Sequence, residues 1–185
     1  MSDTKNVKLG VCKITYDGVD LGLTKGGVDV EVTTATHPVT VDQFGESVIN
    51  EYITKRDIKI KVPLAETTVQ NLAKTMPGAT LQGDGGTGNA RKYRVVVGHG
   101  IGTNLLSIAK ELVLHPIELA DNDESEDLRV FKAATPGGMK FAYKHDQERV
   151  FECEFMGYPE NTAGSPFLGK LFMIGDNAIS GFTDV

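Results

Sequence analysis

The stretches Val28-Asp29-Val30-Glu31-Val32 and Ile58-Lys59-Ile60-Lys61-Val62 decide the fold class, because both alternate apolar with charged residues. A period of two places successive side chains on opposite faces of an extended strand, so each stretch predicts a strand with one buried face. Residues 151–155 repeat the pattern, with two phenylalanines and a cysteine alternating with two glutamates. Further strands are expected at 7–15, 93–97, 112–114, 128–133, 139–143 and 171–174, between glycine-rich turns. The chain is therefore expected to be mainly β.

A long hairpin is expected around the turn Asp42-Gln43-Phe44-Gly45-Glu46. The residues before it, 28–41, and after it, 48–62, are both strand-like, and such arms are longer than the usual strand of about five or six residues. At ~3.3 Å per residue, the hairpin would project well beyond a small domain. A projecting hairpin of this length typically contacts another molecule.

One segment has the periodicity of a helix. Val69, Leu72, Ala73 and Met76 fall at i, i+3, i+4 and i+7, which is the spacing of an amphipathic helix. A helix is therefore expected over about 66–76.

The ends of this helix also have sequence signals. Thr67 and Gln70 have the spacing of a capping box, and Pro77-Gly78 is a typical stop. Residues 103–110 fit a second helix or a strand that begins near Leu106. The absence of a cap and a stop in the sequence favours the strand.

Composition fits a single domain over 1–185, with 1–6 and 180–185 as possible arms. A chain of 185 residues buries roughly 70% of its unfolded surface, so a proper core is expected. The two cysteines, Cys12 and Cys153, cannot form a disulfide framework and are expected to be free thiols, with Cys153 buried. The start is polar and no apolar run approaches a membrane span, so a cytosolic protein is expected.

Charge and glycine content narrow the function further. The formal net charge is -6, which argues against a surface that binds nucleic acid tightly. The chain has 21 glycines, a larger share than the usual ~7%, which indicates many turns or close backbone approaches. Several of them are expected in turns, including one near Gly157.

No catalytic residue, metal site or cofactor is expected, and the chain is not expected to be an enzyme. The four histidines, His115 among them, are scattered and are expected in exposed loops or at strand ends. The glycine-rich run 83–88 leads into a strand and lacks the following Lys of a phosphate-binding loop, so a flexible loop is expected over 82–91. The acidic run 121–127 lacks the central glycine of a calcium loop and is expected to be solvated.

Three motifs in order resemble the N-terminal half of the tail tube proteins of long-tailed, non-contractile phages, also called major tail proteins. They are Gly26-Gly27 before a strand, Val41-Asp42-Gln43-Phe44-Gly45 at a turn, and Val62-Pro63-Leu64-Ala65-Glu66 before the helix. Their order and spacing match over 7–77. Residues 107–116, 129–134 and 148–159 resemble the C-terminal half of the family more loosely.

The resemblance implies a β-sandwich or barrel with one flanking helix and a long projecting hairpin. It further implies six copies per ring and rings stacked into a hollow conduit for the ejection of genome DNA. Expected partners are further copies of the chain and the tail tip or baseplate, tape-measure and tail-terminator proteins, without a membrane. The expected location is the tail of the virion, after assembly in the host cytoplasm.

With that family pattern, Asp29, Glu31, Lys59 and Lys61 are expected to face the bore of the tube. The alternative for these four is an ordinary solvated sheet face. Because Lys59 and Lys61 can pair across strands with Glu31 and Asp29, we expect a wall that DNA passes without being held.

Ring-to-ring contacts are expected from the turn Asp42, Gln43, Phe44, Gly45 and Glu46, from the loop with Gly83, Asp84, Gly85 and Gly86, and from both termini. Loops of this kind can order when rings stack.

Two other readings stay open at this point. One is the inner tube protein of a type VI secretion system or of a contractile tail, which has the same barrel, helix and ring plan. The other is a monomeric β-barrel domain that binds a ligand in its mouth, which would require polar groups converging in an apolar pocket.

Overall fold

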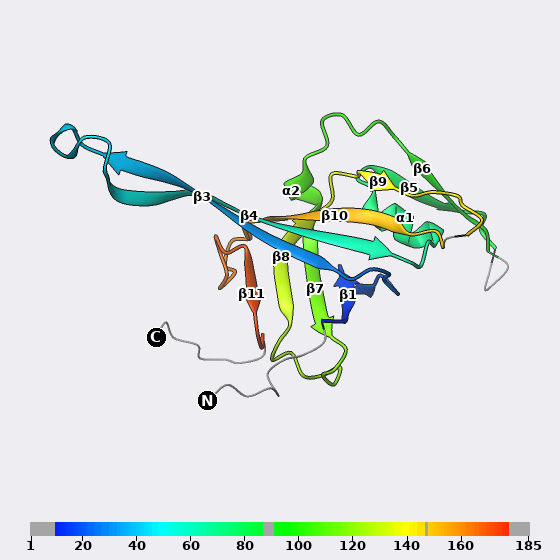
Figure 1. Ribbon diagram of the computed structural model, residues 1–185. Helices are drawn as coiled ribbons and strands as arrows, with labels where there is room; N and C mark the ends of the chain where they lie inside the picture. Colours follow the sequence, from blue (N-terminus) through cyan, green and yellow to red (C-terminus); the bar gives the residue numbers. More distant parts are fainter. Residues whose placement is uncertain (1–9, 87–90, 147, 178–185) are drawn as a thin grey trace.

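The computed structural model describes residues 10–86, 91–146 and 148–177, and one antiparallel sheet dominates it (Figure 1). The prediction of a mainly β chain is confirmed. The sheet runs in the order β2-β1-β7-β8-β10-β4-β3, with β11 on β8 and β9 on β10, while β5 and β6 form a separate hairpin. The strands are β1 (Cys12–Tyr16), β2 (Val19–Asp20), β3 (Asp29–Thr40), β4 (Val48–Leu64), β5 (Ala79–Gly83), β6 (Tyr93–Val97), β7 (Lys110–Pro116), β8 (Leu128–Ala134), β9 (Met139–Lys140), β10 (Phe151–Tyr158) and β11 (Phe172–Ile174); the helices are the 3-10 helix η2 (Asp42–Phe44), α1 (Val69–Thr75) and α2 (Leu105–Ile108).

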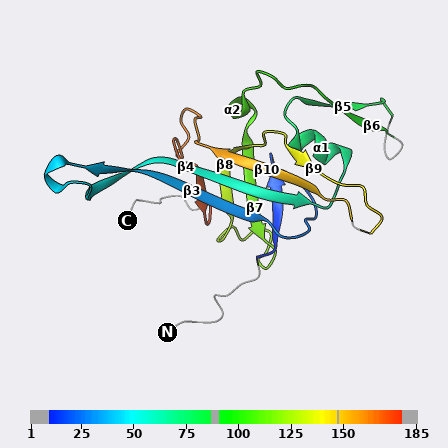
Figure 2. The same cartoon turned by 45° about the horizontal axis from the view of Figure 1, so that its top comes forward.

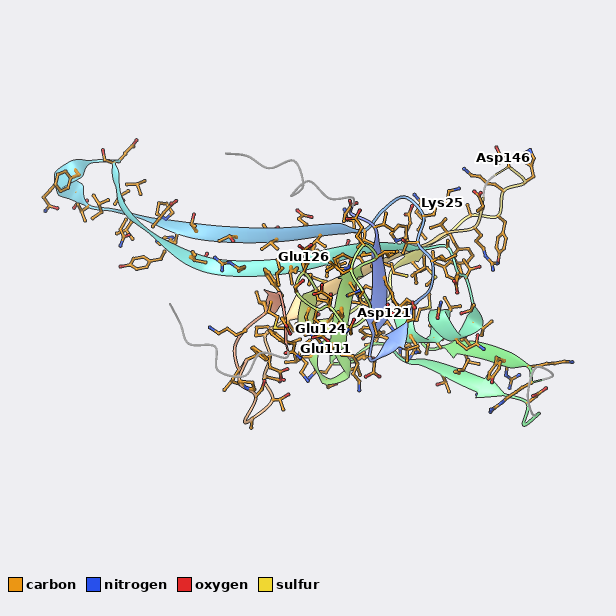
Figure 3. All side chains as sticks on the ribbon, turned by 90° about the horizontal axis from the view of Figure 1, so that it is seen from below. Lys25, Glu111, Asp121, Glu124, Glu126 and Asp146 are labelled. Carbon is orange, nitrogen blue, oxygen red and sulfur yellow. The ribbon has the colours of Figure 1, made fainter. Side chains whose placement is uncertain are left out.

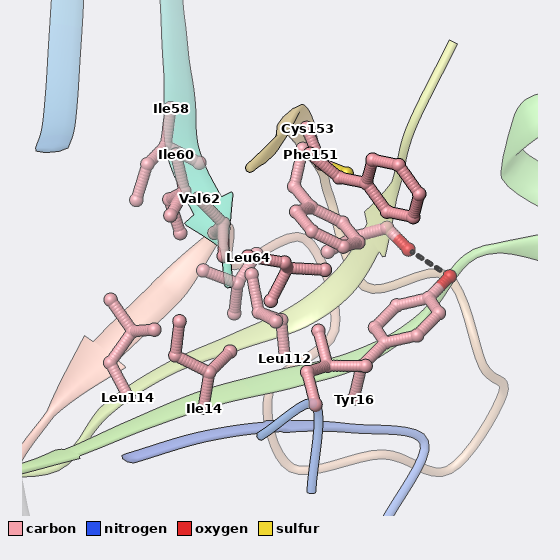
Figure 4. Close-up of a cluster of buried hydrophobic side chains, with 14 residues drawn as sticks. Ile14, Tyr16, Ile58, Ile60, Val62, Leu64, Leu112, Leu114, Phe151 and Cys153 are labelled. Atoms are coloured by element: carbon pink, nitrogen blue, oxygen red, sulfur yellow. Dashed lines mark hydrogen bonds between the residues drawn. The ribbon is translucent and has the colours of Figure 1, made fainter. Parts of the chain in front are cut away.

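The sheet curls around a single cluster of buried side chains. Three strands separate β1 from β4 in the sheet, yet Ile14 of β1 and Ile60 of β4 belong to the same cluster (Figure 4). A flat sheet cannot bring these strands together, so the sheet must curve back on itself. Thr24, after β2, forms a bridge to Leu64 at the end of β4 and joins the two sides. The apolar positions of 58–62 and 151–155 all lie in this core, as the alternation predicts.

The long hairpin is confirmed, and its outer part stands alone. β3 has 12 residues and β4 has 17, paired from Asp29 opposite Lys61 to Thr40 opposite Val48. We call residues 33–56 the arm; within its two strands every residue but Val39 is exposed. Figures 1 and 2 show the arm projecting from the body with no other element beside it.

The expectation that Val30 and Val32 are buried is wrong. Both lie opposite core residues of β4, but they are 40% and 45% exposed. The physical reason is that β3 is the edge strand of the sheet, so it has a neighbouring strand on one side only and its apolar side chains lie at the margin of the core.

Helix α1 is shorter than the expected 66–76, and its cap differs by one residue from the prediction. Thr68 is the N-cap, and its Oγ1 accepts a hydrogen bond from the backbone N–H of Asn71 at 3.2 Å. The capping box of Thr67 and Gln70 is therefore wrong. The Thr67 hydroxyl instead accepts a hydrogen bond from Nη2 of Arg149 at 2.7 Å.

The helix stops as predicted. Met76 is the C-cap, and Gly78, with a φ of +72°, lies in the turn that follows, closed by a hydrogen bond from the N–H of Ala79 to the carbonyl oxygen of Met76 at 3.1 Å. Buried Asn71 donates from Nδ2 to the carbonyl oxygen of Leu21 at 2.8 Å, which holds the helix on the body.

The strand expected to begin near Leu106 begins at Lys110 instead. Residues Leu105–Ile108 form the short helix α2, because Asn104 Oδ1 accepts hydrogen bonds from the N–H groups of Leu106 and Ser107. The sequence contained this cap, and the strand interpretation overlooked it.

Other boundaries shift by a few residues. The strand expected at 7–15 is observed as β1, and residues 7–9 lie outside the described part of the chain. Of 139–143, only Met139–Lys140 form a strand, β9. The possible arms 1–6 and 180–185 also lie outside the described residues.

Gly157, expected near a turn, lies inside β10. A Cβ at this position would lie 2.3 Å from Cγ2 of Ile58 and 3.1 Å from Cγ1 of Val130. Glycine is needed here because two core side chains of neighbouring strands occupy the space next to its Cα.

Tyr16 makes the stability of the core depend on pH in the alkaline range. Its ring packs on Phe155 with the centroids 5.1 Å apart, and its hydroxyl donates to the carbonyl oxygen of Ala133 at 3.2 Å. Burial, and secondarily the carboxylate of Asp17, raise the pKa of Tyr16 to about 12.

We therefore expect the free energy of unfolding to fall as pH rises from about 10 to about 12. In that window the unfolded chain has released the Tyr16 proton while the folded chain still holds it, so folding opposes ionisation. With allowance for solvent screening, the loss is on the order of 1–2 kcal/mol. Urea unfolding at several pH values measures it. Tyr16→Phe should lack this component, and an unchanged pH profile in that variant would contradict the assignment.

Candidate functional site

The residues predicted to face a bore share one exposed face of the sheet. Asp29 of β3 lies directly opposite Lys61 of β4, and Glu31 lies opposite Lys59, so the predicted cross-strand register is confirmed. This face extends onto β10, where Glu154 lies opposite Lys61 and Glu152 lies opposite Pro63. We call it the charged face; it comprises Asp29, Glu31, Lys59, Lys61, Glu152 and Glu154. The alternation in 151–155 had signalled the two glutamates, but the sequence did not show that β10 adjoins β4.

The charged face has mixed signs with an acidic excess. Four carboxylates and two ammonium groups give it a net charge of -2. The ion pair within it joins Nζ of Lys59 to Oε1 of Glu154 at 3.8 Å, rather than to Glu31. Both side chains are more than a third exposed, so this pair adds little stability.

An open depression of about 800 Å³ lies at one end of the charged face, where the paired glycines 26–27 meet β9 and β10. Positively charged lysines and negatively charged glutamates line it, and so do Val62 and Cys153. Burial raises the pKa of the Cys153 thiol, which keeps it protonated and a poor nucleophile at neutral pH. Lys25, which lines the depression, forms an ion pair with Glu148 and so holds the pKa of Glu148 below its usual range.

The tip of the arm is fully exposed and acidic. Asp42, Gln43 and Phe44 form η2, Gly45 ends it, and Glu46 follows. Phe44 is 68% exposed. Residues 38–54, which we call the distal arm, contain three carboxylates and no lysine or arginine.

Apolar side chains continue along the distal arm without cover. Tyr52 and Ile53 are 61% and 60% exposed, and Val48 and Ile49 are exposed as well. Figure 3 shows the side chains of the arm extending on either side of its ribbon, away from the body. The arm therefore exposes the kind of surface that is typical of a protein–protein interface. Among the described residues, no other part of the same chain covers this surface.

The loop expected over 82–91 is in part an ordered hairpin, which corrects the prediction. Gln82 and Gly83 belong to β5 and pair with Arg94 and Tyr93 of β6. Beyond them, Oδ1 of Asp84 accepts hydrogen bonds from the N–H groups of Gly86 and Lys92, at 3.0 and 3.1 Å. This turn contains Gly85, and residues 87–90 lie outside the described part.

The β5–β6 hairpin carries three cations that the sequence analysis did not single out: Arg91, Lys92 and Arg94. The guanidinium of Arg91 lies over the ring of Tyr93, 5.2 Å from its centroid. Nε of Arg94 donates to Oε1 of Gln82 at 2.7 Å.

His115 and Asp127 correct two further predictions. His115 was expected in an exposed loop or at a strand end; it lies near the end of β7 but is buried, with Nδ1 2.6 Å from Oδ1 of Asp127. Asp127 is likewise buried rather than solvated, because it immediately precedes β8, the neighbour of β7. Of the rest of the acidic run labelled in Figure 3, Asp121 and Glu126 are exposed and Glu124 is half-buried. Across residues 10–86, 91–146 and 148–177, no three His, Cys, Asp or Glu side chains gather as a metal site.

Comparison with protein-family models and with curated proteins gave no match. Within the described residues, no helix has the length and apolar character needed to cross a membrane.

Proposed function

We propose that the protein is the structural subunit of a phage tail tube, whose copies join into six-membered rings that stack into a hollow conduit for DNA. The observation that carries the proposal is the arm, a long hairpin with exposed apolar side chains that its own chain leaves uncovered. The motifs that resemble tail tube proteins include the turn at the tip of this arm.

The open edges of the sheet support assembly. The main path of the sheet ends at β2 on one side and at β3 on the other. An exposed edge with unpaired N–H and C=O groups favours pairing with another chain, and closure of copies into a larger barrel removes such edges. β3 is also the strand whose Val30 and Val32 lack cover.

The energetics of the arm favour a partner. Full burial of one large apolar side chain contributes about 1.5–3 kcal/mol. Val48, Ile49, Tyr52 and Ile53 are each about half exposed, so covering all four contributes roughly 3–6 kcal/mol toward the roughly 4–15 kcal/mol that association costs in lost freedom.

The charged face suits the wall of a bore through which DNA moves. Each phosphate contact by a lysine or arginine adds affinity through counterion release and slows transit. A face with a net charge of -2, on which Lys59 is paired with Glu154, offers few such contacts. DNA would pass along it weakly repelled.

Electron microscopy tests the proposal directly. The purified protein is expected to form rings or tubes by size-exclusion chromatography with light scattering and by negative stain, and an antibody against it should label the tails of intact particles. Unlabelled tails together with a strictly monomeric protein would refute the tube assignment. Labelled tubes that lack DNA and belong to a secretion apparatus would instead favour the type VI alternative.

Reversal of acidic charges on the charged face is expected to create DNA binding. Asp29→Lys, Glu31→Lys and Glu154→Lys together change the face from -2 to +4 per subunit. Assembled variant tubes should bind duplex DNA in fluorescence anisotropy, with log K falling against log salt by about 0.9 per phosphate contact, whereas wild-type tubes should not bind at physiological salt.

The matched control reverses three scattered exposed acids, Glu118, Asp121 and Asp146, and produces the same overall charge. It should bind DNA no better than wild type. Equal binding by both variants would place the charged face outside the bore.

A further inference from the structure

Two hairpins project from opposite ends of the body and carry opposite charge. The distal arm lies at one end and the β5–β6 hairpin at the other, in every view of Figures 1 and 2. Residues 38–54 carry Asp42, Glu46 and Glu51, a net charge of -3. Residues 79–97 carry Arg91, Lys92 and Arg94 against Asp84, a net charge of +2.

No ion pair within residues 10–86, 91–146 and 148–177 neutralises either set of charges. Among the described residues, Asp42 and Glu46 form no ion pair, and Glu51 accepts its hydrogen bond from the neutral hydroxyl of Thr36. On the other hairpin, the interactions of the two arginines within the described residues involve uncharged groups, the ring of Tyr93 for Arg91 and the amide of Gln82 for Arg94. Each hairpin therefore presents its own net charge at its end of the body.

Both hairpins also expose apolar side chains beside these charges. On the distal arm they are Phe44, Val48 and Ile49, and on the β5–β6 hairpin they are Leu81, Val96 and Val97. An apolar patch rimmed by charge is typical of a protein–protein interface.

We propose that the distal arm of one copy docks against the β5–β6 hairpin of a second copy. This inference rests on the proposed function and names the partner of the arm. The two surfaces differ and lie at opposite ends of the body, so the contact is heterologous. Each copy can bind one neighbour through its arm and another through its β5–β6 hairpin, so the same contact repeats from copy to copy. Like charges oppose arm-to-arm contact, so the charges also set the direction of assembly.

Charge reversal on each hairpin separately tests the pairing. Asp42→Lys with Glu46→Lys changes the distal arm from -3 to +1, and Arg91→Glu with Arg94→Glu changes the β5–β6 hairpin from +2 to -2. In each variant, two like-charged surfaces would have to meet. The critical concentration for assembly, measured by light scattering, should rise about tenfold or more in both, a difference that moderate salt reduces.

Mixing the two variants is the decisive measurement. The arm-reversed copy has two positive surfaces and the hairpin-reversed copy has two negative surfaces, so each pairs only with the other. The mixture should assemble near the wild-type concentration, as should a single chain that carries all four substitutions. Glu118→Lys with Asp121→Lys, which changes the net charge as the arm reversal does, should leave assembly unchanged.

The possible results separate this inference from the tube proposal. Wild-type tubes together with unimpaired single reversals, or with a mixture no better than its components, would overturn the pairing and leave the tube proposal standing. A wild-type chain that stays monomeric at every concentration and is absent from tails would overturn both. All four positions are exposed, so each variant is expected to fold. Circular dichroism and thermal melting check this and exclude misfolding as the cause of lost assembly.

Discussion

Removal of residues 36–54, which form most of the arm, is expected to abolish assembly and to leave the domain folded. Ala35 lies opposite Lys55, so replacement of 36–54 by Asn-Gly closes the hairpin with a two-residue turn that suits the strand twist. The core residues of β4 begin at Ile58, and no residue of the deleted segment is buried. The free energy of unfolding should therefore change by less than about 0.5 kcal/mol.

Assembly should fall below detection, because the deletion removes the tip, three carboxylates and the uncovered apolar side chains together. Light scattering and negative-stain microscopy measure this loss. A full-length control with Val48→Ile and Tyr52→Phe keeps the apolar surface and should assemble. Rings of normal size from the shortened chain would show that the arm is not the assembly element.

Gly157→Val is expected to have the largest effect on stability. A Cβ at this position meets Ile58 Cγ2 at 2.3 Å, and both Ile58 and Val130 are 1% exposed or less. Neither neighbour has free space to move into, so the overpacking should destabilise the fold by about 3 kcal/mol or more. A domain of ordinary stability, about 5–15 kcal/mol, would lose a large share of it.

Two companion variants isolate the cause. Gly138→Ala adds a methyl group where no atom lies within 4 Å, and it should be nearly neutral. Gly157→Ala combined with Ile58→Ala should be less destabilised than the sum of the single changes, because the smaller side chain makes room for the added Cβ. Additive losses in urea unfolding would point to backbone effects rather than to this contact.

Local patterns in the sequence carried much of the fold. The alternation in 28–32, 58–62 and 151–155 follows from the geometry of a single strand, so it needs no knowledge of neighbours. The great length of the hairpin could be predicted for the same reason, since β3 and β4 are adjacent in the chain.

Apart from the local cap at Asn104, the errors concern contacts between distant segments. Thr67 and Thr68 are equally good caps by residue type, and the choice falls to Thr68 because Arg149 engages the Thr67 hydroxyl. His115 is buried on β7, which lies between β1 and β8, and its partner Asp127 comes just before β8.

Glu152 and Glu154 belong to the charged face because β10 lies beside β4, a pairing between segments far apart in the sequence. The cations of the β5–β6 hairpin were overlooked because their significance depends on the acidic arm at the other end of the body. The charged face and the paired charges of the two hairpins both depend on where elements lie in space, and the periodicity of the sequence does not predict this.

Strand β4 runs without interruption from Leu64 in the core to Val48 near the tip of the arm. In a tube built from such subunits, one continuous backbone would be anchored in its own domain at one end and in a neighbour at the other. A pulling force along the tube would then be borne by the covalent backbone of β4 and by its hydrogen bonds to β3, which would be loaded in shear. It would not rest on side-chain contacts alone. The register shifts at Ala35/Thr36 and Val39/Thr40 both fall within the arm, where this ladder would yield first. The tube would bend at the arms while the domains stay rigid.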